Sequence, residues 1–372
     1  MASPHRIRVA VAGLGTIARL AHLPMLERRN DLFTVAAVSD LSRSAVAEVG
    51  QRVGVPETAR YTDAAAMIAA GGFDAVLLLT SGSHGALAAQ ALQAGLPVFC
   101  EKPLAYTRAE AAALHGDLMV GYMKQYDPAV VQAEAALKAA GGPDAVHAVD
   151  ITVLHPDGDR QLAFAHLRPP PDVPTETLHE VRRADDALVR AAVGDDPGHH
   201  ALYRILVNSV SHDLSLLRLF TGSPATADHV VTWRTSSGGE PSVEVSGHLA
   251  GPGRYAVRWH YLAGYPAYRE TVTIHHATGS LELVFPSPYL MNAPTTLTIV
   301  DGYGGAERRS QYRSVVEAFE QELVAFHAMV TAGAPPLTGV AGGVEDLLTS
   351  QRIVRRHGEL AGRPAGGEAA TA

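Results

Sequence analysis

Short apolar runs and stretches of helical spacing alternate along the first third of the chain. Helical stretches, including residues 64–70 and 85–94, separate runs whose β-branched and other apolar residues predict buried strands. Four such runs are Ile7 to Ala12, Phe33 to Ser39, Phe73 to Thr80 and Pro97 to Cys100. Alternation of strand and helix favours a parallel sheet with helices on both faces, so we expect a first domain over residues 1–120.

Beyond residue 120 the pattern changes to successive strands joined by short links. Several runs alternate apolar and polar residues with a period of two, which indicates strands with one buried face. They are residues 146–154, 227–235, 243–249, 255–262, 271–275, 281–285 and 297–300. Strands joined by short links pair antiparallel. We therefore expect a second α/β domain over residues 121–360, with an open, mainly antiparallel sheet.

Two helices and a tail are predicted at the end of the chain. Apolar residues repeat at intervals of three and four from Tyr312 to Val330, which predicts an amphipathic helix. A shorter helix is expected over residues 343–357. The small-residue tail, residues 361–372, is predicted to be disordered.

One polar segment, residues 156–200, does not fit this plan, because it is rich in proline and histidine and carries no strand pattern. Thr177 followed by Glu180 resembles a capping box, and apolar residues then form a helical face that ends at Gly194. Two interpretations of this insertion remain open. It is either a surface decoration or subunit contact, or a lid or wall over a cleft.

Composition and charge narrow the class of protein. A net charge of −8 argues against nucleic acid or an anionic membrane as the main partner. No apolar run reaches the roughly 20 residues that span a bilayer. The single cysteine, Cys100, excludes an internal disulfide, and a cytoplasmic protein follows most simply. The eighteen histidines form no metal-binding motif, so we expect no metal site.

A glycine-rich loop follows the first predicted strand and opens a helix. Its first glycine permits a tight turn, its second lets the backbone approach a pyrophosphate, and the helix N-terminus then faces the phosphates. The residues concerned are Gly13, Gly15, Thr16 and Ile17. In this setting the loop predicts a doubly wound, Rossmann-type domain that binds a dinucleotide.

Asp40, at the end of the second predicted strand, bears on the choice of dinucleotide. A carboxylate there accepts hydrogen bonds from the ribose hydroxyls and repels a 2′-phosphate, which favours NAD. Arg43, three residues later, is a possible phosphate clamp, so NADP stays open as an alternative.

Lysine is rare in this chain: only three of the thirty basic residues are lysines, and Lys102 stands in the tripeptide Glu101-Lys102-Pro103. An ammonium is a compact donor whose pKa shifts readily on burial, which arginine cannot match. A lysine at the end of the predicted nucleotide-binding domain therefore calls for a chemical role.

Three stretches are similar in order and spacing to the Gfo/Idh/MocA oxidoreductase family: VAVAGLGTIARLAHLPML, VLLLTSGSHGALAAQALQAGLPVFCEKPLA and VGYMKQYDP. The similarity covers the first 128 residues closely and resumes at residues 208–222. It implies an NAD(P)-dependent enzyme that transfers hydride between nicotinamide and a secondary alcohol or ketone of a sugar, cyclitol or related polyol. It also implies a homo-oligomer, which we expect to form through the C-terminal sheet.

The resemblance also implies roles for single residues. Lys102 would contact the substrate and the nicotinamide ribose, and His212 would be the acid/base, a role that suits an imidazole titrating near neutral pH. Ser81, His84 and Glu101 would line the cofactor, and Lys124 and Tyr126 would face the substrate.

One departure from the family pattern concerns the reaction itself. The family usually has an aspartate where this chain has Asn208, four residues before His212. Asparagine still donates a hydrogen bond to a hydroxyl, but it cannot accept a proton. A redox-neutral enzyme on the same scaffold therefore remains an alternative, through elimination, hydrolysis or epimerisation, and a non-catalytic dinucleotide sensor is a second one.

Overall fold

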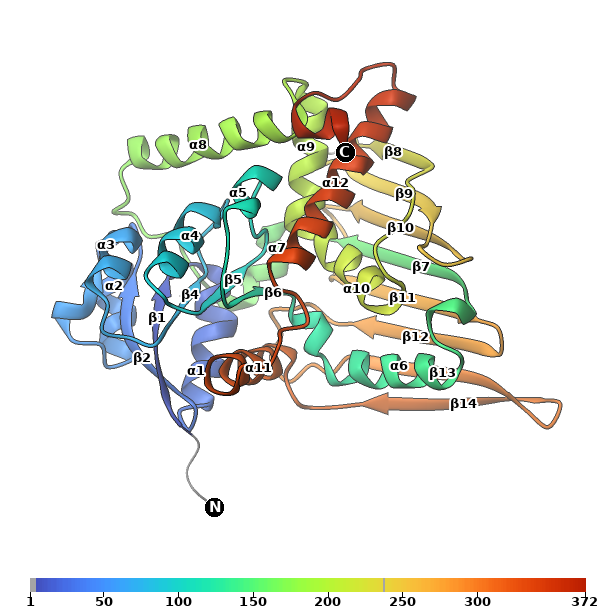
Figure 1. The fold of residues 1–372 in the computed structure, drawn as a ribbon, viewed down its shortest axis with the longest axis horizontal. Coiled ribbons are helices and arrows are strands. Elements are labelled where there is room, and N and C mark those ends of the chain that lie inside the picture. The colour runs from blue at the N-terminus through green and yellow to red at the C-terminus, as the bar shows by residue number, and fades with distance from the viewer. Residues whose placement is uncertain (1–4, 237) are drawn as a thin grey trace. The chain divides into compact units, whose positions relative to one another are not determined.

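The computed structural model describes residues 5–236 and 238–372 and divides them into two compact units (Figure 1). Unit 1 contains residues 5–122, 165–189 and 319–347. Unit 2 contains residues 123–164, 190–318 (without residue 237) and 348–372. The division is thus not a single cut near residue 120, because two later segments pack with the N-terminal residues.

Unit 1 is built on a six-stranded parallel sheet with the order β3-β2-β1-β4-β5-β6. Its strands are β1 (Ile7–Ala12), β2 (Phe33–Ser39), β3 (Arg60–Tyr61), β4 (Ala75–Leu78), β5 (Val98–Glu101) and β6 (Leu118–Gly121). Every residue of β4 and β5 is buried, which explains their continuous apolar runs. The strand order reverses at β1, the position where such sheets bind ligands beyond their carboxyl ends.

The helices of unit 1 come from three parts of the chain. The N-terminal part supplies η1 (Ala18–His22), α1 (Leu23–Arg28), α2 (Arg43–Arg52), η2 (Glu57–Ala59), α3 (Ala64–Ala70), α4 (Gly85–Gln93) and α5 (Arg108–Ala112). Most of α8 (Thr175–Val193), all but the first residue of α11 (Ala318–Ala332) and the start of α12 (Val340–Leu360) complete the unit. Polar caps fix the helix starts, as where Asp63 accepts from the Ala65 amide and Thr107 forms a capping box with Glu110.

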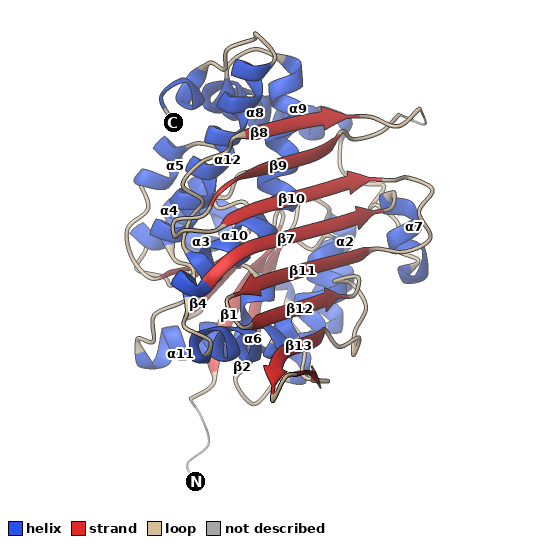
Figure 2. Ribbon diagram, turned by 90° about the vertical axis from the view of Figure 1, so that its right-hand side faces the viewer, coloured by secondary structure: helices blue, strands red, loops and turns tan. Residues whose placement is uncertain are grey.

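Unit 2 contains an eight-stranded sheet with the order β14-β13-β12-β11-β7-β10-β9-β8 (Figure 2). All neighbours pair antiparallel except β7 and β10, which run parallel. The strands are β7 (Val146–His155), β8 (His229–Trp233), β9 (Ser242–His248), β10 (Arg254–Tyr261), β11 (Arg269–His276), β12 (Gly279–Phe285), β13 (Thr296–Tyr303) and β14 (Ala306–Arg313).

Helices of unit 2 cover one face of this sheet (Figure 2). They include α6 (Pro128–Ala139) and α10 (Ser211–Thr221), which pack on strands of the sheet. The other helices outside unit 1 are α9 (Pro197–Ile205), the end of α12, and the short helices η3 (Met123–Tyr126), η4 (Pro143–Ala145), α7 (Gly158–Leu162), η5 (Ala163–Ala165, whose last residue falls in unit 1), η6 (Leu206–Val210) and η7 (Gly367–Thr371). Strand residues alternate accordingly. In β11, Val272 and Ile274 are buried whereas Thr273 and His275 are not.

The structure corrects two expectations about the end of the chain. The helix expected from Tyr312 begins at Ala318, because Tyr312 pairs with Leu297 in the edge strand β14. The tail is not disordered: the Gly366 amide donates to the Val193 carbonyl at 3.1 Å, and Ala369 is fully buried. Local pattern missed both, since strand pairing and tail packing depend on residues far away in sequence.

Candidate functional site

The glycine loop of unit 1 has the geometry that its sequence predicts. Gly13 adopts a φ of +93°, and its amide donates to the Ser39 carbonyl at 2.8 Å. A Cβ at Gly13 would lie 2.6 Å from the backbone of Leu79, so only glycine fits. A Cβ at Gly15 would meet no described atom within 4 Å. The backbone is therefore open at Gly15, where a pyrophosphate must approach closely.

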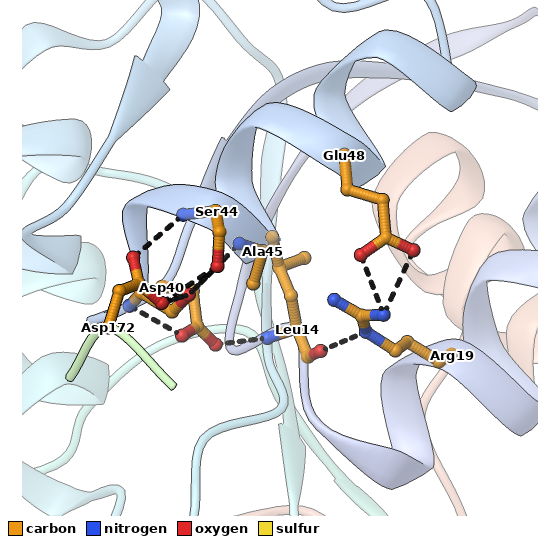
Figure 3. A network of polar contacts seen from close by, with 8 residues as sticks. Leu14, Arg19, Asp40, Ser44, Ala45, Glu48 and Asp172 are labelled. Carbon is orange, nitrogen blue, oxygen red and sulfur yellow. Dashed lines mark hydrogen bonds and ion pairs between the residues drawn. The ribbon is translucent and has the colours of Figure 1, made fainter. Parts of the chain in front are cut away.

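Asp40 ties this loop to the start of α2 (Figure 3). Its carboxylate accepts from the Leu14 amide at 2.8 Å and from the Ser42 amide at 2.9 Å. Asp40 is half-buried, and an ionised carboxylate accepts about four hydrogen bonds. Capacity for the ribose hydroxyls therefore remains beside these two bonds. Thr16 and Ile17 lie in the helical turn that follows the loop, and Arg43 is exposed as the first residue of α2.

The loop after β4 is joined to the Glu-Lys-Pro segment by His84. This buried imidazole lies 2.9 Å from the Thr80 carbonyl through Nε2 and 2.7 Å from the Pro103 carbonyl through Nδ1. Burial lowers the pKa of His84, while the two carbonyl acceptors oppose that change. The structure thus shows His84 holding two loops together. Ser81, in the same loop, is exposed.

Glu101 and His22 form a buried pair directly behind Lys102. The Glu101 Oε1 atom lies 2.8 Å from His22 Nε2, and the Lys102 amide donates to Glu101 Oε2 at 3.2 Å. Burial raises the pKa of Glu101, but the hydrogen bond and charge of His22 and the charge of Lys102 outweigh it, so the pKa falls below its usual value. Glu101 therefore stays ionised. Lys102 itself is half-buried.

A second buried acid, Glu322 of α11, belongs to the same part of unit 1. It is fully buried, and neither carboxyl oxygen has a hydrogen-bond partner among the described residues. Burial and the negative charge of Glu101 raise the pKa of Glu322 well above its usual value. One neutral acid and one carboxylate thus share this interior.

Replacing Glu322 with glutamine should stabilise the protein increasingly as pH rises. A raised folded-state pKa means that the unfolded chain releases this proton first, so wild type loses stability above about pH 4.5 and glutamine does not. We expect a gain of about 1–3 kcal/mol in unfolding free energy at pH 8 and little at pH 4.5. Urea denaturation at both values measures it. Glu320→Gln, an ion-pair loss on the same helix, is the control and should show no such gain. Parallel curves for Glu322→Gln and wild type would contradict the assignment.

In unit 2, Lys124 is buried rather than open. Its ammonium lies 2.5 Å from Glu270 Oε2, 3.9 Å from Asp213 Oδ1 and 5.4 Å from the centre of the Phe285 ring. The Tyr268 hydroxyl also donates to Glu270, at 2.5 Å. Burial and the Glu270 carboxylate raise the pKa of Asp213 well above its usual value. The cluster therefore contains one ammonium, one carboxylate and one neutral acid.

Sequence reasoning did not find Glu270 or Tyr268. Tyr268 directly precedes strand β11, and Glu270 is the second residue of that strand. Glu270 lies 146 residues after Lys124 in the sequence. The one available signal was an acidic residue at an inward position of a strand pattern. Tyr126 is buried in the same short helix as Lys124.

His212 and Asn208 lie at the junction of two helix types. Residues 206–210 form a π-helix (η6), and α10 begins at Ser211. Four-residue spacing therefore does not correspond to one regular α-helical turn here, and π segments are frequent at functional sites. Asn208 donates through Nδ2 to the Arg204 carbonyl at 2.9 Å. Both side chains are half-buried.

The sheet order, the glycine loop and Asp40 define unit 1 as a Rossmann-type nucleotide-binding unit. Residues 7–117 match the model of the oxidoreductase family with an NAD-binding Rossmann fold, GFO_IDH_MocA. The domain carries the glycine loop, Asp40 and the Glu-Lys-Pro segment.

Among curated relatives, inositol 2-dehydrogenase from Paracoccus denitrificans is 36% identical over 152 residues, which are 38% of this chain and 45% of that protein. The chain thus spans about half the length of the curated relatives it matches. The fold extends further. A putative myo-inositol dehydrogenase from Sinorhizobium meliloti gives a TM-score of 0.67 at 20% identity, covering 95% of this chain and 98% of that one. An oxidoreductase from Agrobacterium radiobacter, in complex with NAD+, L-tartaric acid and magnesium, gives a TM-score of 0.66 at 16% identity, covering 99% of this chain and 100% of that one.

Within the part of the chain that the structure describes, no helix combines the length and apolarity that a bilayer crossing requires.

Proposed function

We propose that the protein is an NAD-dependent dehydrogenase that transfers hydride between nicotinamide and a secondary alcohol or ketone of a cyclitol, sugar or related polyol. The observation that carries this proposal is the family domain over residues 7–117, whose glycine loop and Asp40 have the geometry of a dinucleotide site. The inositol 2-dehydrogenase relatives support a cyclitol or similar polyol as substrate.

The chain's own residues would bind, orient and move a proton. Residues 13–17 and Asp40 would hold the dinucleotide, which supplies hydride transfer when bound. Lys102 would polarise the reacting oxygen or stabilise negative charge that develops on it. The ionised Glu101 accepts a hydrogen bond from the Lys102 amide and so helps to fix the backbone at this position. His212 would accept the proton of the substrate hydroxyl.

Asn208 supports a second candidate, a redox-neutral reaction by way of transient oxidation. Its amide donates to the Arg204 carbonyl, and no carboxylate stands at this position to take a proton from His212. Elimination, hydrolysis or epimerisation on the same scaffold would return the hydride to its substrate and leave no net NADH.

An experiment that measures NADH binding and activity separates these functions. We expect purified protein to bind NADH with quenching or enhancement of its fluorescence, and to change NADH absorbance with at least one member of a panel of inositols and aldoses. Product detected by chromatography without a net change in NADH would select the redox-neutral reaction. Absence of any NAD(H) or NADP(H) binding would contradict the proposal.

We also propose a cytoplasmic homo-oligomer that assembles through the face of the eight-stranded sheet that unit 2's helices leave uncovered. This face presents half-exposed polar side chains such as Thr271 and Arg258, whereas most buried positions of the other face are apolar, Glu270 being an exception. Sedimentation equilibrium of the purified protein measures the subunit number, and a monomer at micromolar concentration would contradict the assembly.

A further inference from the structure

The inserted segment docks on the nucleotide-binding unit. Residues 165–189 belong to unit 1, although they lie in sequence between β7 and α9 of unit 2. Two of their carboxylates reach loops on either side of the glycine loop: Asp172 reaches the loop after β2, and Asp185 reaches the loop after β4. The strand order β2-β1-β4 places these loops at the switch point of the sheet.

Asp185 makes the second of these contacts next to a glycine, Gly82. Its Oδ1 atom accepts from the Ser83 amide at 3.4 Å, and Gly82 has a φ of +87°. A Cβ at Gly82 would overlap the Asp185 carboxylate. Glycine at position 82 therefore leaves the space that the Asp185 carboxylate occupies.

Asp172 takes the donors at the start of α2 (Figure 3). Its Oδ1 accepts from the hydroxyls of Ser42 at 2.6 Å and Ser44 at 2.7 Å, and its Oδ2 accepts from the Ser44 amide at 2.9 Å. These hydrogen bonds from Ser42 and Ser44 lower the pKa of Asp172 far below its usual range, so the carboxylate is ionised at neutral pH.

The position of these donors in the domain indicates what Asp172 does. In a Rossmann-type domain the acid at the end of β2 accepts from the ribose hydroxyls, and groups just after it meet a 2′-phosphate. Ser42 and Ser44 follow Asp40 by two and four residues, and hydroxyls at a helix N-terminus are donors that suit an anion. In this chain the anion that accepts from these donors is the Asp172 carboxylate of the protein itself.

We propose that Asp172 is a specificity-determining residue that excludes a 2′-phosphate and so selects NAD over NADP. The inference rests on the proposed dinucleotide binding. Because Asp172 already accepts from Ser42 and Ser44, these donors are not available to a 2′-phosphate. A 2′-phosphate would also be repelled by two carboxylates, Asp40 and Asp172, whereas the 2′-hydroxyl of NAD requires only Asp40 as its acceptor.

Calorimetric titration with 5′-AMP and 2′,5′-ADP, the adenosine halves of NAD and NADP, tests the proposal without any substrate. In Asp172→Asn we expect 2′,5′-ADP to bind at least about tenfold more tightly than in wild type, because one close negative charge is removed, with AMP affinity within about twofold. Asp172→Ala, which also frees the serine and amide donors, should give at least the same gain.

Glu176→Gln is the matched control, since Glu176 is an exposed acid of the same segment and pairs with Arg183. It removes the same charge without touching Ser42 or Ser44, and should leave both affinities unchanged. An unchanged ratio of the two affinities in Asp172→Asn, or an equal change in Glu176→Gln, would overturn the role of Asp172. Failure of wild type to bind NADH and AMP would instead overturn the proposed function on which it rests.

Discussion

Replacing Lys102 with alanine is expected to lower kcat by roughly a hundredfold to a thousandfold, the loss typical of removing one donor from a developing oxyanion. NADH affinity should change by less than about threefold, because residues 13–17 and Asp40 carry most of the dinucleotide contacts in the proposal. Steady-state kinetics with the best substrate of the panel and NADH fluorescence titration give the two quantities.

The rarity of lysine supplies a clean control for this experiment. Lys138 is exposed near the end of α6, so Lys138→Ala removes an equal charge and should leave kcat unchanged. Lys102→Arg keeps the charge but not the compact ammonium, and we expect it to recover little activity. Activity of Lys102→Ala within tenfold of wild type would contradict the catalytic assignment.

Replacing Lys124 with methionine is expected to lower the free energy of unfolding by about 3–5 kcal/mol, because it leaves the buried Glu270 carboxylate without its cation. The neutral Asp213 cannot supply one. Urea denaturation at pH 7 with circular dichroism measures the loss.

A double-mutant cycle shows whether that loss comes from the ion pair. In Lys124→Met with Glu270→Gln, the uncompensated charge is gone, so we expect recovery of at least about 1–2 kcal/mol relative to the single methionine variant. Lys138→Met is the control and should lie within about 0.5 kcal/mol of wild type. Additive effects of the two substitutions would contradict a coupled buried pair.

The nucleotide-binding sheet was largely predictable from sequence. Strands β1 and β2 have the predicted bounds, as does α3. Strand β1 is buried at five of its six positions, so it is a nearly continuous apolar run in the sequence. The seven strands expected in the second part also exist, with ends that differ by a few residues. Their alternation reflects a sheet with one covered face.

The features that could not be predicted from the sequence depend on residues that are distant in the chain. Edge strand β14 is exposed at every position and carries no buried pattern, so no strand is predicted there, and its residue Tyr312 is placed in the following helix instead. The role of Glu270 follows from its ion pair with Lys124, and that of Asp172 from its hydrogen bonds with the serines after β2. Burial and pairing of such groups follow from tertiary packing, which a local pattern does not contain.

The order in which unit 1 collects its segments has a consequence for synthesis of the protein. Phe326 of α11 packs edge-on against Phe99 of β5, with ring centres 5.7 Å apart, and both side chains are fully buried. The ribosome makes residue 99 long before residue 326. The nucleotide-binding unit therefore begins to emerge first but cannot complete its core until α11 has been made, so its nascent sheet lacks the cover of Phe326 over Phe99 until late in synthesis.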